Sequence, residues 1–434
     1  MIIGHVNVPG SEGDVQIECE LYRRELQGGQ MAWSPAGTFR TWTGGEFRFS
    51  DLEAGTYKLI THEQMDRESL LPVPGAPLFG YPPVYYPNTT DFSAASPITV
   101  HAGETSQVNL TVARQQYYPV HIPVANPPAA GGINLNVHPM GHRSPGWSLG
   151  YNPAEEAIDG LLPDGTYTVE ATSFGEPRSS GIVNFSVRGA PAEGTPLRLI
   201  PDTPLTVIVR EEFASDHDAP QMMTMTPNGP RRMPDVQVSL VSMEEFDSFG
   251  GFNQARQVEG SDEHTLLLED VGPGRYKVRV ASSSGYAASI QSGGTDLLHQ
   301  TLVVGLGAEI PPIEITMRDD GAEVSGTVEE AKGSELNSQA NNPNRPLRFA
   351  YLLPLGDSSL QYPPMAQFQG ENFQLKQVPP GNYLLLVYPD APQDLPFGND
   401  EAVDVLKSKG QIIQVEAGEK LSVKATMTSN GESE

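Results

Sequence analysis

The sequence is poor in cysteine and in basic residues. A single Cys occurs in 434 residues, which excludes an internal disulfide. Lys and Arg total 27 against 54 Asp and Glu, so the formal net charge is −27. A surface this acidic repels phosphate backbones, so the composition argues against nucleic-acid binding. A surface of this charge attracts cations rather than anions.

Long apolar runs and enzyme signatures are also missing. No stretch approaches the roughly 20 residues needed to cross a bilayer, so no membrane span is expected. Met1 leads directly into "IIGHVNV", which alternates like a strand, so no signal peptide is expected in this chain. The sequence has no G-x-S-x-G motif, Walker loop, dinucleotide fingerprint or Cys-x-x-Cys pair. We therefore expect no catalytic residue, no cofactor and no metal centre.

Glycine and proline are plentiful instead. The chain contains 44 Gly and 39 Pro without low complexity, which indicates many turns between short strands. The apolar residues of "DVQIECEL" alternate, so Cys19 is expected on the apolar face of a strand as a buried structural thiol. Only "NDEAVDVLKSKG" is typical of a helix, with Asn399 or Asp400 as its N-cap and Gly410 at its end.

One motif occurs four times along the chain. It reads "FRFSDLEAGTYKL", "AIDGLLPDGTYTV", "LLLEDVGPGRYKV" and "FQLKQVPPGNYLL". Successive copies lie about 110 residues apart, which is the length of a domain rather than of a solenoid unit. In each copy a glycine is followed two residues later by a tyrosine: Gly55 and Tyr57, Gly165 and Tyr167, Gly274 and Tyr276, Gly381 and Tyr383.

We interpret the motif as a strand, a tight turn and a returning strand. The glycine would supply the positive φ that such a turn requires. The tyrosine can bury its ring while its hydroxyl reaches a polar partner. Core-facing apolar residues alternate ahead of the turn in three copies, but the second copy has Ala157 and Asp159 there. Either the core of the second repeat is thinner or its register is shifted.

These residues resemble the carboxypeptidase regulatory-like domain, a prealbumin-like (transthyretin-like) β-sandwich. The likeness lies in the F-x-F-x-x-L-x-x-G-x-Y return turn and in V-x-x-G-E before the last strand, and four copies cover essentially the whole chain. It implies an all-β protein of four tandem prealbumin-like or Ig-like β-sandwich domains in an elongated array. We expect domains at 1–113, 114–202, 203–318 and 319–434, the last with one short helix and a frayed tail. The family domain carries no catalysis, and its motif does not specify a ligand.

The stretch "VHAGETS" contains His-x-x-Glu, the spacing of two zinc ligands in metallocarboxypeptidases. The same turn recurs as "VGLGA" and "VEAGE", where Gly305 and Glu416 replace His101. The histidine therefore varies between copies while the turn persists, and no third ligand accompanies it. We interpret "VHAGETS" as a turn before the closing strand of its repeat.

A tyrosine-rich insertion is the strongest candidate for a ligand contact. Tyr81, Tyr85 and Tyr86 lie in "GYPPVYYPNTT", between core strands. Aromatic rings with polar tips stack on sugars and on protein surfaces. The competing interpretation, which we favour, is that the loop folds onto its own sandwich.

Three further candidates are weak. His138 and His142 lie four residues apart, but Pro139 and Gly141 prevent the helix that would bring them together. With the Met-rich "QMMTMTPNGPRRM" they hint at copper, although flexible loops explain both segments. Calcium at acidic joins such as Asp319–Asp320 lacks the supporting D-x-[DN]-x-[DN]-G loop.

The chain looks especially like multi-domain members of this family, which are usually exported. The resemblance therefore implies a non-catalytic, exported, multi-domain β-sandwich protein that acts as a cell-envelope structural spacer, adhesin or assembly subunit. The alternative is a carbohydrate- or peptide-binding accessory module of an exported enzyme or an outer-membrane receptor. The expected partners are proteins or polysaccharides at the cell surface. Exposed strand edges also permit self-association, unless they are blocked. The expected location is secreted or within the cell envelope.

Overall fold

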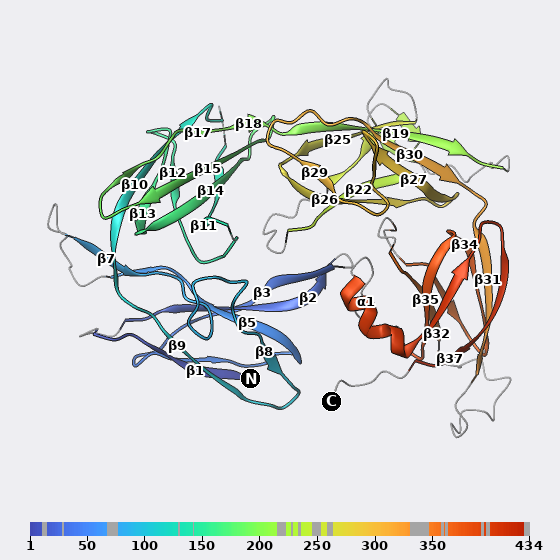
Figure 1. The fold of residues 1–434 in the computed structure, drawn as a ribbon, viewed down its shortest axis with the longest axis horizontal. Helices are drawn as coiled ribbons and strands as arrows, with labels where there is room; N and C mark the ends of the chain where they lie inside the picture. Colours follow the sequence, from blue (N-terminus) through green and yellow to red (C-terminus); the bar gives the residue numbers. More distant parts are fainter. Residues whose placement is uncertain are drawn as a thin grey trace. The chain divides into compact units, whose positions relative to one another are not determined.

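The computed structural model describes Met1 to Thr428 except residues 11–14, 28–29, 67–76, 129–130, 142, 215–222, 227–228, 233–235, 245–252, 258–263, 330–346, 357–359, 361–362, 392–394 and 396–399 (Figure 1). The chain divides into two compact units, Met1–Glu25 with Ala32–Asp202, and Leu26–Met31 with Thr203–Glu434. The described elements are strands except for helix α1 (Asp400–Leu406) and a 3₁₀ turn, η2 (Lys407–Lys409). The predicted all-β class and the predicted helix are confirmed, whereas the expected frayed tail lies outside the described residues.

The first repeat packs two sheets over one core. Their strand orders are β4-β1-β9 and β3-β2-β5-β8. Alternate apolar side chains of these strands form the core, as the period of two along a strand requires. Two further strands, β6 and β7, lie between β5 and β8 in the sequence and belong to another sheet. In chain order the strands are β1 (Ile2–Asn7), β2 (Glu18–Gln27), β3 (Gln30–Arg40), β4 (Glu46–Phe49), β5 (Gly55–Thr61), β6 (Gln64–Met65), β7 (Leu78–Tyr81), β8 (Ile98–Val100) and β9 (Ser106–Thr111).

The second repeat has the same plan, but its first sheet is extended. Strands β6 and β7 join it in the order β12-β13-β10-β7-β6, while the other sheet has the order β11-β14-β15-β18. Its strands are β10 (Gln115–Ala125), β11 (Ile133–Pro139), β12 (Gly150–Asn152), β13 (Ala157–Pro163), β14 (Gly165–Ser173), β15 (Ser179–Val187), β16 (Ala192–Glu193), β17 (Leu197–Arg198) and β18 (Ile200–Pro201).

The third repeat belongs to the second unit. Its sheets have the orders β24-β25-β19-β30-β27-β28 and β23-β22-β26-β29, and β20 pairs with β21 alone. The strands are β19 (Thr203–Glu212), β20 (Met223–Thr226), β21 (Gly229–Arg232), β22 (Gln237–Ser242), β23 (Asn253–Gln254), β24 (Arg256–Gln257), β25 (Thr265–Val271), β26 (Gly274–Ala281), β27 (Tyr286–Ser292), β28 (Thr295–Asp296), β29 (Leu302–Val304) and β30 (Ile313–Arg318).

The fourth repeat completes the second unit. Its sheets have the orders β34-β31-β37 and β33-β32-β35-β36. Helix α1 contributes Val403 to a small cluster with Leu384 and Leu386. The strands are β31 (Ala322–Glu329), β32 (Arg348–Pro354), β33 (Met365–Phe368), β34 (Asn372–Val378), β35 (Gly381–Tyr388), β36 (Gln411–Val415) and β37 (Lys420–Thr426).

All four repeats share one pairing scheme. The first strand of each pairs in parallel with closing strands: β1 with β9, β10 with β16 and β17, β19 with β30, and β31 with β37. It also pairs antiparallel with the strand before the recurring turn: β4, β13, β25 or β34. Each repeat has its own hydrophobic core. The chain is therefore built of four tandem β-sandwiches, while the domain limits and the elongated array stay predictions.

The tyrosine of each turn motif ties the turn to the preceding strand. Its hydroxyl donates a hydrogen bond to the carbonyl four residues earlier, over 2.7 Å at Tyr57, 3.0 Å at Tyr167, 2.9 Å at Tyr276 and 2.8 Å at Tyr383. The carbonyls at the turn are thus satisfied by a side chain whose ring packs toward the core.

The glycine of the motif has a different function from the one expected. A positive φ is absent at Gly55, Gly165 and Gly274, and occurs among the four only at Gly381, with 159°. A Cβ atom at Gly165 would lie 2.8 Å from the hydroxyl oxygen of Tyr167. Glycine therefore leaves room for the tyrosine ring. The expectation that the glycine supplies a positive φ is wrong for these three copies.

The left-handed residue lies ahead of the turn instead. Asp51, Asp270 and Gln377 have φ values of 57°, 54° and 56°. Each stands immediately before the apolar residue that precedes the glycine by three positions. In the third and fourth repeats the strand pairing shifts register near this residue, as at a bulge. The bulge lets residues on both sides of it face the core.

The second repeat lacks this bulge. Leu161 occupies the equivalent position without a positive φ, and β10 pairs with β13 without interruption. Unbroken alternation then buries Ile158 and Leu162 and turns Asp159 away from the core. Of the two explanations for this copy, the shifted register is correct.

Candidate functional site

The predicted tyrosine loop is packed into the protein. Tyr81 is 2% exposed and Tyr85 is fully buried. The Tyr85 hydroxyl donates to the carbonyl of Pro145 over 2.6 Å, and its ring meets Phe92 edge-on at 5.8 Å. Tyr86 is half-buried against the first core. Tyr81 and Tyr85 therefore pack as the favoured interpretation expects and are not offered to a ligand, because burial of such large apolar rings stabilises the fold more than exposure would.

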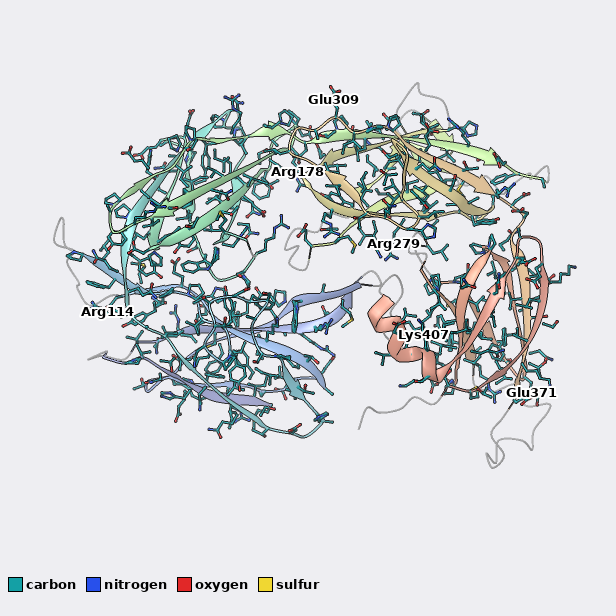
Figure 2. All side chains as sticks on the ribbon, viewed as in Figure 1. Arg114, Arg178, Arg279, Glu309, Glu371 and Lys407 are labelled. Atoms are coloured by element: carbon teal, nitrogen blue, oxygen red, sulfur yellow. The ribbon has the colours of Figure 1, made fainter. Side chains whose placement is uncertain are left out.

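The same loop region joins the first and second repeats. Strand β7 pairs antiparallel with β10, so the repeats share a sheet. The amide of Glu63 donates to the carbonyl of Gly146 over 3.0 Å, and the Ser148 hydroxyl donates to the Glu63 carboxylate over 3.1 Å. Arg114 pairs with Asp66 at 2.6 Å (Figure 2). Backbone, hydroxyl and ion-pair contacts therefore hold this join together.

Glu63 is the titratable group of this join. Burial raises the pKa of its carboxyl to about 7, against the opposing effect of the Ser148 and Tyr117 hydroxyls. Burial and the nearby Glu63 carboxylate also raise the pKa of Tyr117. The join therefore contains an acid that changes charge near neutral pH.

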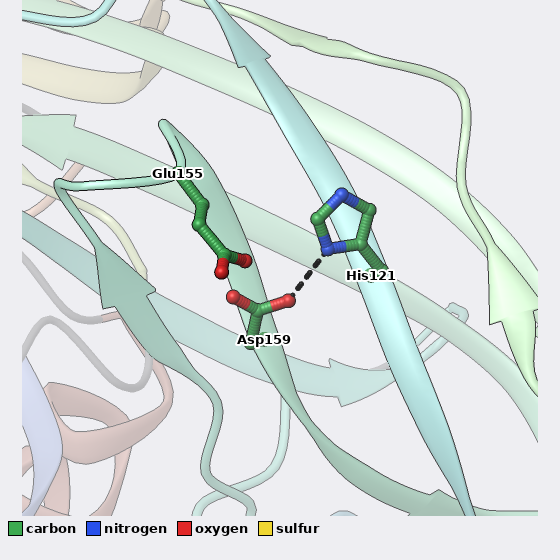
Figure 3. Close-up of side chains that lie close together, drawn as sticks. All are labelled: His121, Glu155 and Asp159. Carbon is green, nitrogen blue, oxygen red and sulfur yellow. Dashed lines mark hydrogen bonds and ion pairs between the residues drawn. The ribbon is translucent and has the colours of Figure 1, made fainter.

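A second polar group lies on the outer face of the second repeat (Figure 3). His121 of β10 and Asp159 of β13 are directly opposite each other, with 2.7 Å between Nδ1 and Oδ1. Glu155 enters from the turn between β12 and β13, and its carboxylate faces that of Asp159. Ligand atoms of the three side chains all lie within 4.8 Å of one another, the one such group of at least three among the described residues.

Sequence reasoning missed His121 and Glu155 and noticed Asp159 only as a departure from the repeat. The two residues His121 and Asp159 are 38 positions apart, and only the register between β10 and β13 brings them into contact. Local sequence patterns do not give that register. The outward parity of His121 within "YPVHIPV" and the acid in the paired strand could have suggested it.

The "VHAGETS" segment is a turn. Gly103 has a φ of 78°, and Gly418 in the corresponding turn has 68°. The Glu104 carboxylate accepts a hydrogen bond from the amide of His101 over 3.3 Å, and Glu419 does the same for Glu416. The described residues near His101 provide no third metal ligand.

His138 is a buried structural residue. Its ring is 5% exposed, with Nδ1 2.9 Å from the carbonyl of Pro139 and Nε2 3.8 Å from the Glu170 carboxylate. Burial alone would raise the pKa of Glu170, but His138 and Arg143 lower it. His142 and the side chains of the Met-rich segment, on which the copper hint depended, lie outside the described residues.

The acidic join between the third and fourth repeats has protein partners. Asp319 accepts a hydrogen bond from the amide of Ala214 over 2.7 Å. Asp320 accepts one from the hydroxyl of Tyr286 over 2.8 Å and lies 4.0 Å from Arg318. These carboxylates therefore serve the join rather than forming free linker charge.

Cys19 is fully buried in the first core. Burial raises the pKa of its thiol to about 12. The prediction of a structural thiol is confirmed, since the reactive thiolate is disfavoured at neutral pH.

Comparison with known proteins leaves the family open. No family model and no curated protein matches the chain. Among solved structures it is similar to the Bacillus anthracis TIE protein, with 9% identity over 98% of this chain and 74% of that one, and a TM-score of 0.18. It is also similar to the RrgB pilus protein of Streptococcus pneumoniae, with 9% identity over 100% and 99% of the two chains and a TM-score of 0.17.

A third similarity is to two B repeat units of the collagen binding protein of Staphylococcus aureus. The identity is 10% over 98% and 99% of the two chains, with a TM-score of 0.17. Values this low carry no inference about function. The carboxypeptidase regulatory-like resemblance remains a prediction.

A membrane-crossing helix is not found in the part of the chain that the structure describes.

Proposed function

We propose that this chain is a non-catalytic, exported, multi-domain β-sandwich protein that acts as a structural spacer, adhesin or assembly subunit of the cell envelope. The observation that carries the proposal is the packed join between the first and second repeats. A protein that sets a distance needs neighbouring domains held in a fixed relation, and this join supplies such a relation.

The join uses residues that a binding loop would leave exposed. Tyr85 is buried with its hydroxyl on Pro145, and β7 completes the sheet of the next repeat. The Arg114 guanidinium lies 4.1 Å from the ring centre of Phe79 and pairs with Asp66. Each hydrogen bond contributes about 1 kcal/mol, so several together oppose bending at the join.

The third and fourth repeats are joined in a comparable way. Val280 and Leu360 form an isolated parallel bridge, and the buried Arg279 donates to the carbonyl of Leu360 over 2.9 Å (Figure 2). Tyr286 binds Asp320 at the beginning of the fourth repeat. Packed joins therefore recur in the second unit, which supports a spacer more than a chain of independent binding modules.

The location and the partners rest on the resemblance to exported multi-domain forms. We place the protein outside the cytosol or in the cell envelope, with cell-surface proteins or polysaccharides as partners. Its acidic surface suits an environment rich in cations.

Distance measurements on the full chain test whether the first two repeats keep a fixed separation, as a spacer requires. Spin labels at Arg48→Cys and Arg188→Cys, in a Cys19→Ser background, report the separation of the first two repeats by pulsed electron resonance. A single narrow distance distribution is expected. The control is the same chain with a Gly-Ser insertion after Arg114. An unmodified chain whose distribution is as broad as the control, or turnover in a hydrolase panel, would contradict the proposal.

The binding-module alternative has its own observation. The side chains of Trp42 and Phe174 are 53% and 67% exposed, so among the described residues these two large aromatic rings are open to stacking on a sugar or peptide. Binding on a glycan or peptide array that disappears in Trp42→Ala or Phe174→Ala would favour the alternative. Retention of binding in both variants would count against it.

A further inference from the structure

The repeats differ in how they neutralise charge on the sheet that contains the first strand. In the third repeat, Arg210 pairs with Glu314 across β19 and β30 at 2.9 Å. In the fourth repeat, Lys424 pairs with Glu329 across β37 and β31 at 3.1 Å. Arg and Lys keep their charge at neutral pH, so these outward-facing acids are compensated by the protein itself.

The second repeat uses a histidine where these two repeats use an arginine or a lysine. Residues 114–202 contain no lysine. Within the described residues, Lys and Arg form no ion pair with Glu155 or Asp159, and His121 is the only basic partner of Asp159. Strand register also places the exposed Glu193 beside His121 on the opposite side from Asp159. Carboxylates are therefore gathered around His121 without the arginine or lysine partner found in the third and fourth repeats.

We propose that His121, Glu155 and Asp159 bind one divalent transition-metal ion, of which Zn²⁺ is the test case. An imidazole nitrogen with two carboxylate oxygens is a ligand set that zinc accepts. The ion would supply the positive charge that an arginine or lysine supplies in the third and fourth repeats. A nitrogen ligand favours zinc over Ca²⁺ and Mg²⁺, which take oxygen ligands.

The scaffold holds the three side chains near one another before an ion binds. His121 and Asp159 occupy directly opposed positions of paired strands. The turn that contains Glu155 is fixed by two hydrogen bonds: the Val124 amide donates to the Glu156 carbonyl over 2.7 Å, and the Ala154 amide donates to the Asn152 side chain over 3.1 Å. Little ordering of the backbone is therefore required on binding.

The group is open to solvent. The side chains of His121 and Asp159 are 47% and 37% exposed, so an ion can enter and retain water at its remaining positions. The same open positions could accept a donor group from a neighbouring molecule.

Isothermal titration of the EDTA-treated full chain with ZnCl₂ tests the site, in buffer with excess Mg²⁺ to suppress diffuse binding to the acidic surface. One Zn²⁺ per chain is expected. His121→Ala and Asp159→Asn should each raise Kd at least about tenfold. The matched control is His101→Ala, which removes a histidine near a single glutamate and should leave Kd unchanged.

Unchanged zinc binding in both site variants, or no stoichiometric binding by the unmodified chain, would overturn the proposal. If either variant fails to fold, NMR of the unmodified chain decides the matter. Addition of Zn²⁺ should shift the His121 imidazole resonances before those of His101, and the reverse order would refute the site. Neither result depends on the spacer function.

Discussion

The second repeat and the other three contain the same turn motif but differ by one backbone conformation. Asp51, Asp270 and Gln377 adopt a positive φ before the turn, whereas Leu161 does not. That single difference decides which parity of the preceding strand faces the core. Without the bulge, Ile158 is buried and Asp159 turns outward, opposite His121. In the second repeat, loss of the bulge thus places Asp159 on the surface at a position that faces the core in the other repeats.

The test with the largest expected effect compares alanine substitutions at two neighbouring residues of β13, one buried and one on the surface. Ile158→Ala should lower the free energy of unfolding by about 3 kcal/mol, because it removes buried methyl groups and leaves a cavity. Asp159→Ala should change it by about 0.5 kcal/mol or less. Urea denaturation of both variants measures the difference. A larger loss for Asp159→Ala would show that the second repeat has the register of the others.

A second test asks how far the second repeat depends on its join to the first. Burial raises the pKa of Glu63 from 4.5 to about 7, so the folded protein holds this proton more tightly than the unfolded chain. Its contribution to stability is therefore fully present below pH 4.5 and is lost as the pH rises through about 7, on the order of 3 kcal/mol in total. Urea denaturation across this range should show the decline, and Glu63→Gln should remove it. Equal pH profiles for the two proteins would contradict a buried Glu63.

A third test separates the two explanations for the turn glycine. Gly165→Ala places a methyl group against the Tyr167 ring and should cost about 1–3 kcal/mol through overpacking. In a Tyr167→Ala background the same change should cost much less, because the clash is gone. Thermal unfolding of the four proteins gives the coupling. Additive effects would instead support a requirement of the backbone.

The smallest effect concerns the bulge itself. Gln377→Gly should stabilise the fourth repeat by up to about 1 kcal/mol, since glycine adopts a positive φ without steric cost. Leu161→Gly should destabilise the second repeat, because this position lies in regular strand. Opposite signs in chemical denaturation would verify the comparison, and stabilisation by both changes would break it.

Much of the fold could be read from the sequence because its signals are local. The glycine and tyrosine spacing marked each turn, and the single helical segment was recognised by its end signals. The function of Gly165 was misread because the crowding atom belongs to Tyr167, whose position over the glycine depends on tertiary packing. His121 was missed because its partner lies 38 residues away and is brought close only by strand register.

The parallel pairing of first and last strands has a mechanical consequence. The chain enters a repeat at one end of this pair and leaves at the other, so tension shears the strands and loads their hydrogen bonds together. Six paired positions join β1 to β9, and six join β19 to β30. Seven join β31 to β37, whereas β10 meets β16 and β17 at two positions each. In single-molecule pulling we expect the second repeat to yield first and to act as the extensible element of the chain.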